Sequence, residues 1–108
     1  MKNILFICSK NKWRSLTAET IFKNHPHCNV KSAGTEEGAR VKVNAKLIQW
    51  ADHILVMERK HKEKMQLKFP EEITDKEIIV LDIADEYKYM DKELIEELES
   101  ALEAVLDY

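Results

Sequence analysis

The chain has 108 residues, of which 44% are hydrophobic, with a net charge of −3 and two cysteines, Cys8 and Cys28. This length suits one domain with one buried core, expected over residues 1–108. The negative charge argues against broad nucleic-acid binding, which needs a basic face, and two cysteines are too few for a disulfide scaffold. No apolar run could span a bilayer, and the short apolar start lacks signal-peptide features, so we expect a cytoplasmic protein with no membrane partner.

The chain alternates between predicted strands and predicted helices. Unbroken apolar runs predict buried strands at residues 4–8, 53–57 and 78–81, with a shorter strand at 29–32. Apolar residues at helical spacing predict helices at 14–23, 44–51, 58–68 and 91–106, with Asn44 and Asp91 as N-caps. This order predicts an α/β fold with three layers, α/β/α, around a four-stranded parallel sheet. In such folds the ligand site lies beyond the carboxyl ends of the strands.

The connection between the first strand and the first helix carries a pattern with chemical meaning. Cys8 ends the strand, five residues follow, and Arg14 and Ser15 begin the helix. A short loop entering a helix N-terminus turns backbone N–H groups inward and forms an anion-binding nest. We expect Cys8 at the base of this nest as a thiolate, a nucleophile toward phosphorus. The guanidinium of Arg14 suits two phosphoryl oxygens, and Ser15 can donate a hydrogen bond to the sulfur.

This connection resembles the N-terminal signature of the low-molecular-weight protein tyrosine phosphatase family. The resemblance covers residues 4–15 and continues at 18–22, with support from 32–35, 51–57 and 82–87, the last resembling the family's acid loop. It implies the family's fold and a phosphate-binding loop around Cys8 and Arg14, made of Ser9, Lys10, Asn11, Lys12, Trp13 and Ser15. Asn11 matches a position that holds this loop in shape, and asparagine tolerates left-handed backbone.

The resemblance also implies a two-step mechanism that needs no metal or other cofactor. Cys8 attacks a phosphomonoester substrate, which includes phosphotyrosine in a protein. An aspartic acid protonates the departing oxygen, and the same carboxylate then activates water to hydrolyse the cysteinyl-phosphate. Asp85 aligns best with this acid, and Asp82 is the alternative. Tyr87 and Tyr89 are candidate cleft residues that can stack on an aryl substrate. The oligomeric state stays undetermined.

The sequence departs from the family pattern in the loop and in one segment. Lys10 stands where the family has glycine, so we expect backbone strain if its φ is positive. Trp13 replaces a second loop cysteine, and we expect it to pack beneath the first helix. Glu86 replaces the usual proline of the acid loop. Lys10 and Lys12 are either solvated loop residues or an attraction for an acid-flanked substrate. Segment 35–50 is shorter than in the family, which predicts a more open cleft.

Two other functions compete with hydrolysis. Arsenate reductases use the same fold and loop, but that chemistry needs further cysteines to pass on a disulfide, and only Cys28 is available. A catalytically weak phosphate-binding or phospho-carrier module also has a cysteine in this loop, yet does not require Arg14 paired with Asp85. The cluster at residues 25–28 contains two histidines and Cys28, and a turn that ends the helix explains it better than a metal site.

Overall fold

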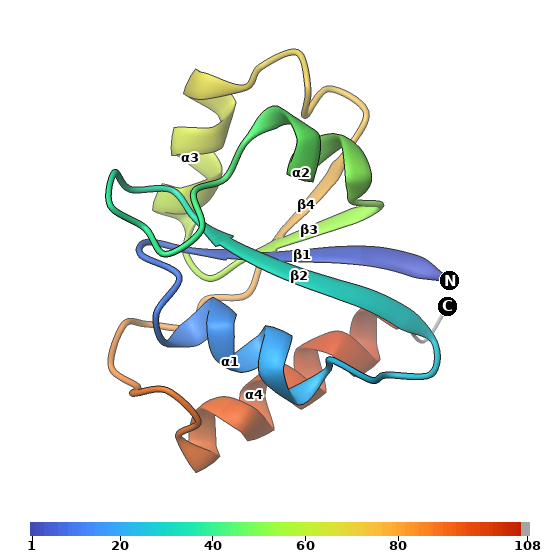
Figure 1. The fold of residues 1–108 in the computed structure, drawn as a ribbon, viewed down its shortest axis with the longest axis vertical. Helices are drawn as coiled ribbons and strands as arrows, with labels where there is room; N and C mark the ends of the chain where they lie inside the picture. The colour runs from blue at the N-terminus through green and yellow to red at the C-terminus, as the bar shows by residue number, and fades with distance from the viewer. Residues whose placement is uncertain (107–108) are drawn as a thin grey trace.

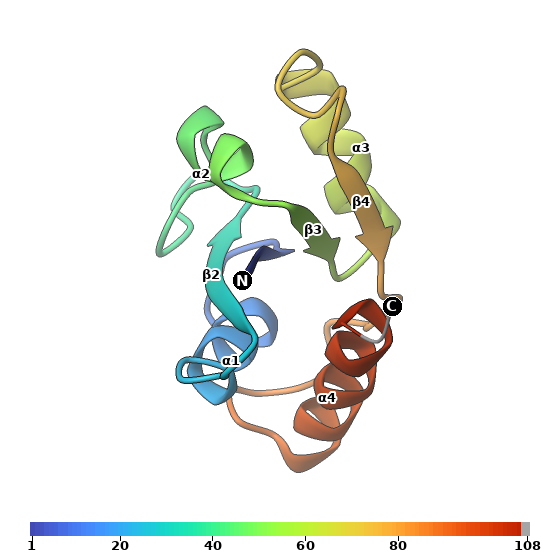
Figure 2. The same cartoon turned by 90° about the vertical axis from the view of Figure 1, so that its right-hand side faces the viewer.

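The computed structural model describes residues 1–106, and it contains a parallel sheet with strand order β2-β1-β3-β4. The strands are β1 (Lys2–Cys8), β2 (Cys28–Gly34), β3 (His53–Val56) and β4 (Glu77–Val80). The helices are α1 (Arg14–Ile21), α2 (Ala45–Trp50), α3 (Arg59–Lys68) and α4 (Lys92–Leu106). Helices α1 and α4 cover one face of the sheet, and α2 and α3 cover the other (Figures 1 and 2). The predicted three-layer α/β fold is confirmed.

Strand β1 lies at the centre of the core, and the side chains of residues 4–7 are fully buried. Successive side chains point to opposite faces of a strand. Ile4 and Phe6 therefore pack with α1 and α4, whereas Leu5 and Ile7 pack with α2 and α3. A strand covered on both faces needs apolar residues at every position, so the unbroken run at residues 4–8 correctly predicted this placement.

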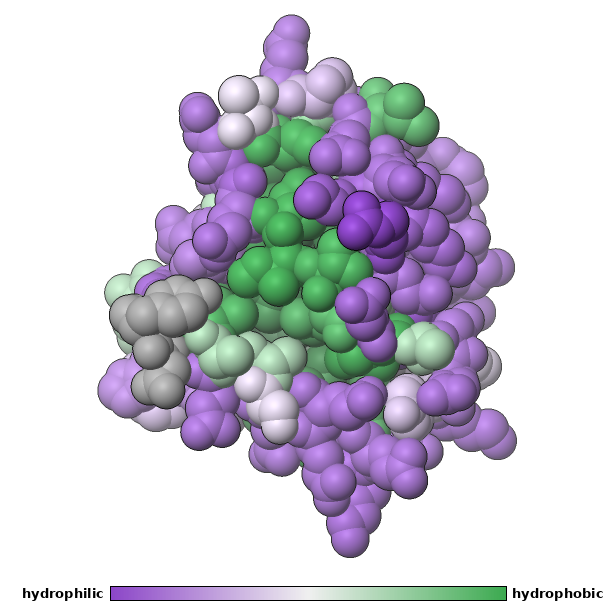
Figure 3. Space-filling model, turned by 180° about the vertical axis from the view of Figure 1, so that it is seen from behind, coloured by the Kyte–Doolittle hydropathy of each residue, from purple (hydrophilic) through white to green (hydrophobic). Residues whose placement is uncertain are grey.

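Strand β4 is less buried than its apolar sequence predicts. It forms the edge of the sheet, and Ile78, Ile79 and Val80 are only partly buried. Ile79 packs on the α4 side and Ile78 on the α3 side, which explains the apolar run. Seen from behind, the surface carries a hydrophobic band in this region (Figure 3). An apolar run indicates that both faces are covered, but it does not distinguish an edge strand from a central one.

The helix starts follow the predicted capping residues. The side chain of Asn44 accepts a hydrogen bond from the backbone N–H of Leu47 at 2.9 Å, and Asp91 accepts one from the N–H of Glu93 at 2.9 Å. Such caps satisfy N–H groups that have no partner within the helix. No helix within residues 1–106 has the length and apolar character needed to cross a membrane.

Candidate active site

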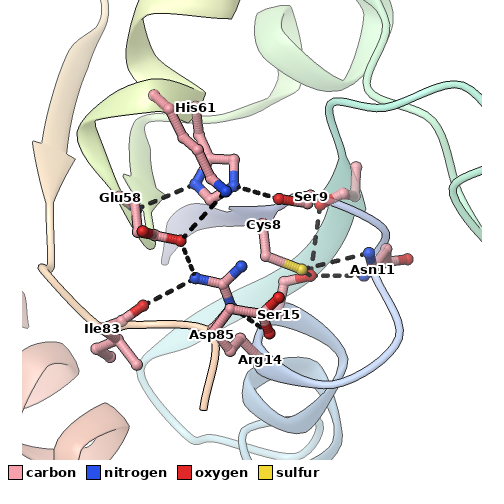
Figure 4. A network of polar contacts seen from close by, with 11 residues as sticks. Cys8, Ser9, Asn11, Arg14, Ser15, Glu58, His61, Ile83 and Asp85 are labelled. Carbon is pink, nitrogen blue, oxygen red and sulfur yellow. Dashed lines mark hydrogen bonds and ion pairs between the residues drawn. The ribbon is translucent and has the colours of Figure 1, made fainter. Parts of the chain in front are cut away.

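A pocket of about 200 Å³ opens at the carboxyl edge of the sheet, where β1 gives way to α1. Its lining residues are Cys8, Ser9, Lys10, Lys12, Trp13, Arg14 and Asp85. The Cys8 side chain is almost fully buried, and its sulfur accepts a hydrogen bond from the backbone N–H of Asn11 at 3.3 Å. The Ser15 hydroxyl lies 2.9 Å from the same sulfur (Figure 4). The structure thus brings most of the sequence-predicted site residues together around one thiol.

Segment 35–40 forms hydrogen bonds with the backbone of the Cys8 loop, which comprises residues 8–15. The backbone N–H groups of Thr35, Glu36 and Arg40 donate to the carbonyls of Cys8, Ser9 and Lys10, each at 3.0 Å. The Arg40 Nε–H also donates to the carbonyl of Asn11 at 3.3 Å. Four consecutive carbonyl oxygens of the loop are therefore bound by segment 35–40. With its carbonyls fixed in this way, the loop can turn backbone N–H groups toward an anion, as a nest requires.

Gly34 permits this close contact between the segment and the loop. A Cβ atom at Gly34 would lie 2.5 Å from the carbonyl oxygen of Ser9 and 2.8 Å from the Cβ of Ala39. Both distances are shorter than such atoms tolerate, so this position requires glycine because there is no room for a Cβ atom. The sequence marked residues 32–35 only as a turn after the second strand, and this steric reason needed the structure.

Asn11 sets the shape of the Cys8 loop. Its φ is 58°, in the left-handed region that asparagine tolerates, and its side-chain amide donates to the hydroxyls of Ser15 and Ser32 at 2.8 Å each. Lys10 is not among the described residues with positive φ. The strain expected at Lys10 is therefore absent, because the left-handed turn falls on the next residue.

The guanidinium of Arg14 is held by groups from two other parts of the chain. Its Nη1 donates to Oε1 of Glu58 at 2.6 Å and to the carbonyl of Ile83 at 2.9 Å, and only 2% of its side chain is exposed. The hydrogen bond from Arg14 is the main reason that the pKa of Glu58 lies below its usual value. A buried guanidinium fixed in this way needs little reorganisation to receive a phosphoryl group.

Glu58 also connects Arg14 to a buried histidine, His61, in the first turn of α3. Nδ1 of His61 accepts a hydrogen bond from the backbone N–H of Glu58 at 3.0 Å, and Nε2 lies 2.9 Å from the hydroxyl oxygen of Ser9 (Figure 4). Burial, followed by the charge of Arg14, lowers the pKa of His61 to about 4.

Sequence reasoning predicted a helix over residues 58–68, but assigned neither Glu58 nor His61 to the site. A usable signal was present. Glu58 comes just after β3, whose carboxyl end meets that of β1, and the spacing from Glu58 to His61 is that of a capping box.

Of the two candidate acids, Asp85 lies in the pocket. Its Oδ1 is 3.7 Å from Nε of Arg14, and about half of its side chain is exposed. Asp82 is exposed, has left-handed backbone with φ of 57°, and is not among the residues that line the pocket. The loop after β4 therefore presents Asp85, and not Asp82, to Cys8.

Three aromatic residues lie elsewhere than expected. Trp13 does not pack beneath α1: 46% of it is exposed, and it lines the pocket, because it precedes the first helical turn while Ala18 and Phe22 take up the core positions. Tyr87 packs against the core, and the Tyr89 hydroxyl lies 3.0 Å from that of Thr20. Neither tyrosine lines the pocket, so the structure gives no support to their expected cleft role.

The two cysteines lie at opposite ends of the sheet. Cys28 pairs with Lys2 across β1 and β2, whereas Cys8 pairs with Gly34. Six residues of strand separate the two positions, which corresponds to about 20 Å. Both thiols are free, and this separation does not allow Cys28 to form a disulfide with Cys8 without unfolding the sheet.

Comparisons with known proteins agree with this geometry. Residues 3–48 match the family model of low molecular weight phosphotyrosine protein phosphatases. A protein-arginine-phosphatase from Geobacillus stearothermophilus is 34% identical over 92 residues, a match that spans 63% of this chain and 62% of that protein. The matched region is thus less than two thirds of the length of that relative.

Solved structures give matches over nearly the whole chain. The YwlE arginine phosphatase from Geobacillus stearothermophilus superposes with a TM-score of 0.71 and 26% identity, covering 99% of this chain and 89% of that one. The tyrosine phosphatase Wzb from Escherichia coli K30, in complex with phosphate, shares the fold with a TM-score of 0.77 and 24% identity, covering 99% and 98%.

The fold and the pocket define an α/β protein with a buried cysteine at the start of the loop between the first strand and the first helix. Residues 3–48 resemble the low-molecular-weight phosphotyrosine protein phosphatase family, and nearly the whole chain shares the fold of the solved phosphatase structures.

Proposed function

We propose that the chain acts, as a single domain, as a cysteine-dependent phosphomonoester hydrolase that forms a cysteinyl-phosphate intermediate. The observation that carries this proposal is that Cys8, Arg14 and Asp85 line one pocket, with the backbone N–H of Asn11 donating to the sulfur. The match of residues 3–48 to a phosphatase family model supports the same reaction class. The Ser15 hydroxyl, 2.9 Å from the sulfur, can stabilise Cys8 as a thiolate and later as a leaving group.

In the first step, the phosphoryl group of the substrate enters the nest, where backbone N–H groups and Arg14 hold its non-bridging oxygens. The Cys8 thiolate attacks phosphorus, and the bond to the ester oxygen breaks. Asp85 delivers its proton to that oxygen, so that the alcohol or phenol leaves neutral. In the second step, Asp85 takes a proton from water, the resulting hydroxide attacks phosphorus, and Cys8 leaves as a thiolate with release of inorganic phosphate.

The charges around the pocket bear on the substrate. Three of its lining residues are cationic, Lys10, Lys12 and Arg14, and one is anionic, Asp85. The curated relative is named as an arginine phosphatase and Wzb as a tyrosine phosphatase. A phosphoarginine side chain brings a guanidinium close to these cations, whereas a phosphotyrosine ring with acidic neighbours complements them. We therefore propose phosphotyrosine with acidic neighbouring residues as the substrate. We also propose that the enzyme is cytoplasmic.

The reaction is tested by hydrolysis of an aryl phosphate from about pH 4.5 to about pH 8. We expect turnover that a metal chelator does not abolish, none in Cys8→Ser, a strong reduction in Asp85→Asn, and inhibition by vanadate. Asp82→Asn is the matched control and keeps the wild-type rate. A wild-type protein that binds vanadate without turnover would instead be a phosphate-binding or phospho-carrier module.

The substrate class is tested separately with three peptides of equal length. They carry phosphotyrosine flanked by glutamates, phosphotyrosine flanked by lysines, or phosphoarginine. We expect the highest kcat/KM for the glutamate-flanked peptide, with a preference that weakens at high salt because the charges are then screened. A preference for phosphoarginine would contradict the substrate assignment and leave the reaction class untouched.

A further inference from the structure

The ring of His61 can hold its proton in only one place. The backbone N–H of Glu58 donates to Nδ1 at 3.0 Å, so Nδ1 must carry a lone pair. The neutral ring then carries its proton on Nε2, which lies 2.9 Å from Oγ of Ser9. Nε2 is therefore the donor in this contact, and the Ser9 oxygen is the acceptor. The side chain of His61 is fully buried at the N-terminal turn of α3, which fixes the ring in this orientation.

The consequence concerns the hydroxyl proton of Ser9. Because the Ser9 oxygen accepts from His61 on the side of α3, its own O–H is free to donate elsewhere. Ser9 directly follows Cys8 and lines the same pocket. Its backbone carbonyl accepts a hydrogen bond from the N–H of Glu36 at 3.0 Å, which fixes its main chain.

We propose that Ser9 is a further anion-binding residue, whose hydroxyl donates to a non-bridging oxygen of the phosphoryl group at Cys8, and that His61 is its positioning residue. This inference rests on the proposed function, since it needs a phosphoryl group in the pocket. It goes beyond backbone N–H groups and Arg14 by adding a side-chain donor. One residue, Glu58, supports both Arg14 and Ser9. Its carboxylate holds the Arg14 guanidinium, and its backbone N–H orients the His61 ring that contacts Ser9.

The test measures vanadate affinity and kcat/KM for an aryl phosphate in variants of the two residues. Ser9→Ala removes the donor and is expected to weaken both quantities by roughly tenfold to a hundredfold, the range for a hydrogen bond to a charged group. Ser9→Thr keeps the hydroxyl and stays within about threefold of wild type. Thr20→Ala, which removes an exposed hydroxyl on α1, is the control and is expected to change neither quantity.

The role of His61 is tested by His61→Phe, which keeps a planar ring but has no nitrogen. We expect weaker vanadate binding, by about tenfold or less, because the Ser9 hydroxyl remains but is no longer oriented. The double variant with Ser9→Ala is expected to bind vanadate no more weakly than Ser9→Ala alone, since His61 acts only through Ser9. Independent losses that multiply would show that His61 has a general structural role and would overturn its assignment.

Two further outcomes separate this inference from the proposed function. Wild-type vanadate affinity in Ser9→Ala would overturn the donor role, whatever the enzyme's activity. Vanadate binding that depends on Ser9 in a wild-type protein without turnover would keep the donor and reject hydrolysis. Failure of wild type to bind vanadate would overturn both. The tautomer is read directly from long-range ¹H–¹⁵N spectra of the imidazole, where protonation on Nδ1 at neutral pH would contradict the assignment.

Discussion

Lowering the pH is predicted to destabilise the fold through His61, and the size of the effect follows from its burial. The pKa of His61 falls from 6.5 to about 4 in the folded protein. Between these values the unfolded chain binds a proton that the folded protein excludes, so stability is complete above about pH 6.5 and is lost as the pH falls toward 4. The shift of about 2.5 pH units corresponds to about 3 kcal/mol, with a slope of about 1.4 kcal/mol per pH unit.

The assay is urea unfolding at a series of pH values between about 7 and about 4, for wild type and for His61→Phe. The phenylalanine variant lacks the titrating ring. The loss of unfolding free energy over this range is therefore expected to be about 3 kcal/mol smaller in the variant than in wild type. Its lower stability at neutral pH does not matter, because only the slopes are compared. Glu58 contributes mainly below about pH 4.5, since its pKa is lowered, and it is present in both proteins. Equal slopes in the two proteins would refute the reasoning.

Three other changes test how the Cys8 loop is held. Gly34→Ala places a Cβ 2.5 Å from the Ser9 carbonyl oxygen. We expect the free energy of unfolding, measured in urea, to fall by about 1–3 kcal/mol, and phosphatase activity to fall with it. Unchanged activity would argue against the steric role. Asn11→Ala removes two buried hydrogen bonds and the residue suited to φ of 58°, so we expect vanadate affinity, measured by calorimetry, to fall at least tenfold. Glu58→Gln leaves Arg14 buried without its carboxylate, which is expected to cost about 2 kcal/mol at neutral pH, and this difference from wild type is expected to shrink as the pH falls below about 4.5, because the pKa of Glu58 is lowered in the fold.

The elements of the fold that could be predicted are those in which the local residue pattern and the burial of the residues indicate the same structure. The apolar run at residues 4–8 predicted the central strand, and the five-residue spacing from Cys8 to Arg14 fits only a short connection into a helix. Asn44 and Asp91 predicted helix starts because capping is a local interaction. The loop, the strand and the helix together were enough to locate the pocket.

The remainder depends on which side chains meet across the fold, and sequence spacing does not contain that information. His61 and Ser9 are separated by 52 residues and come together only because β1 and β3 are neighbours. Trp13 was expected in the core, yet whether its ring lies inward or at the pocket depends on what α1 and α4 leave unfilled. The place of β4 at the edge likewise follows from strand order, which its own residues do not determine.

The most direct test of the proposed reaction is mass spectrometry of protein that has been mixed with an aryl phosphate and quenched with acid. Wild type is expected to carry a phosphoryl group on Cys8, and Asp85→Asn is expected to accumulate more of it, because this variant lacks the base that activates water for the second step. A phosphoryl group on any other residue, or full turnover in Cys8→Ser, would contradict the mechanism.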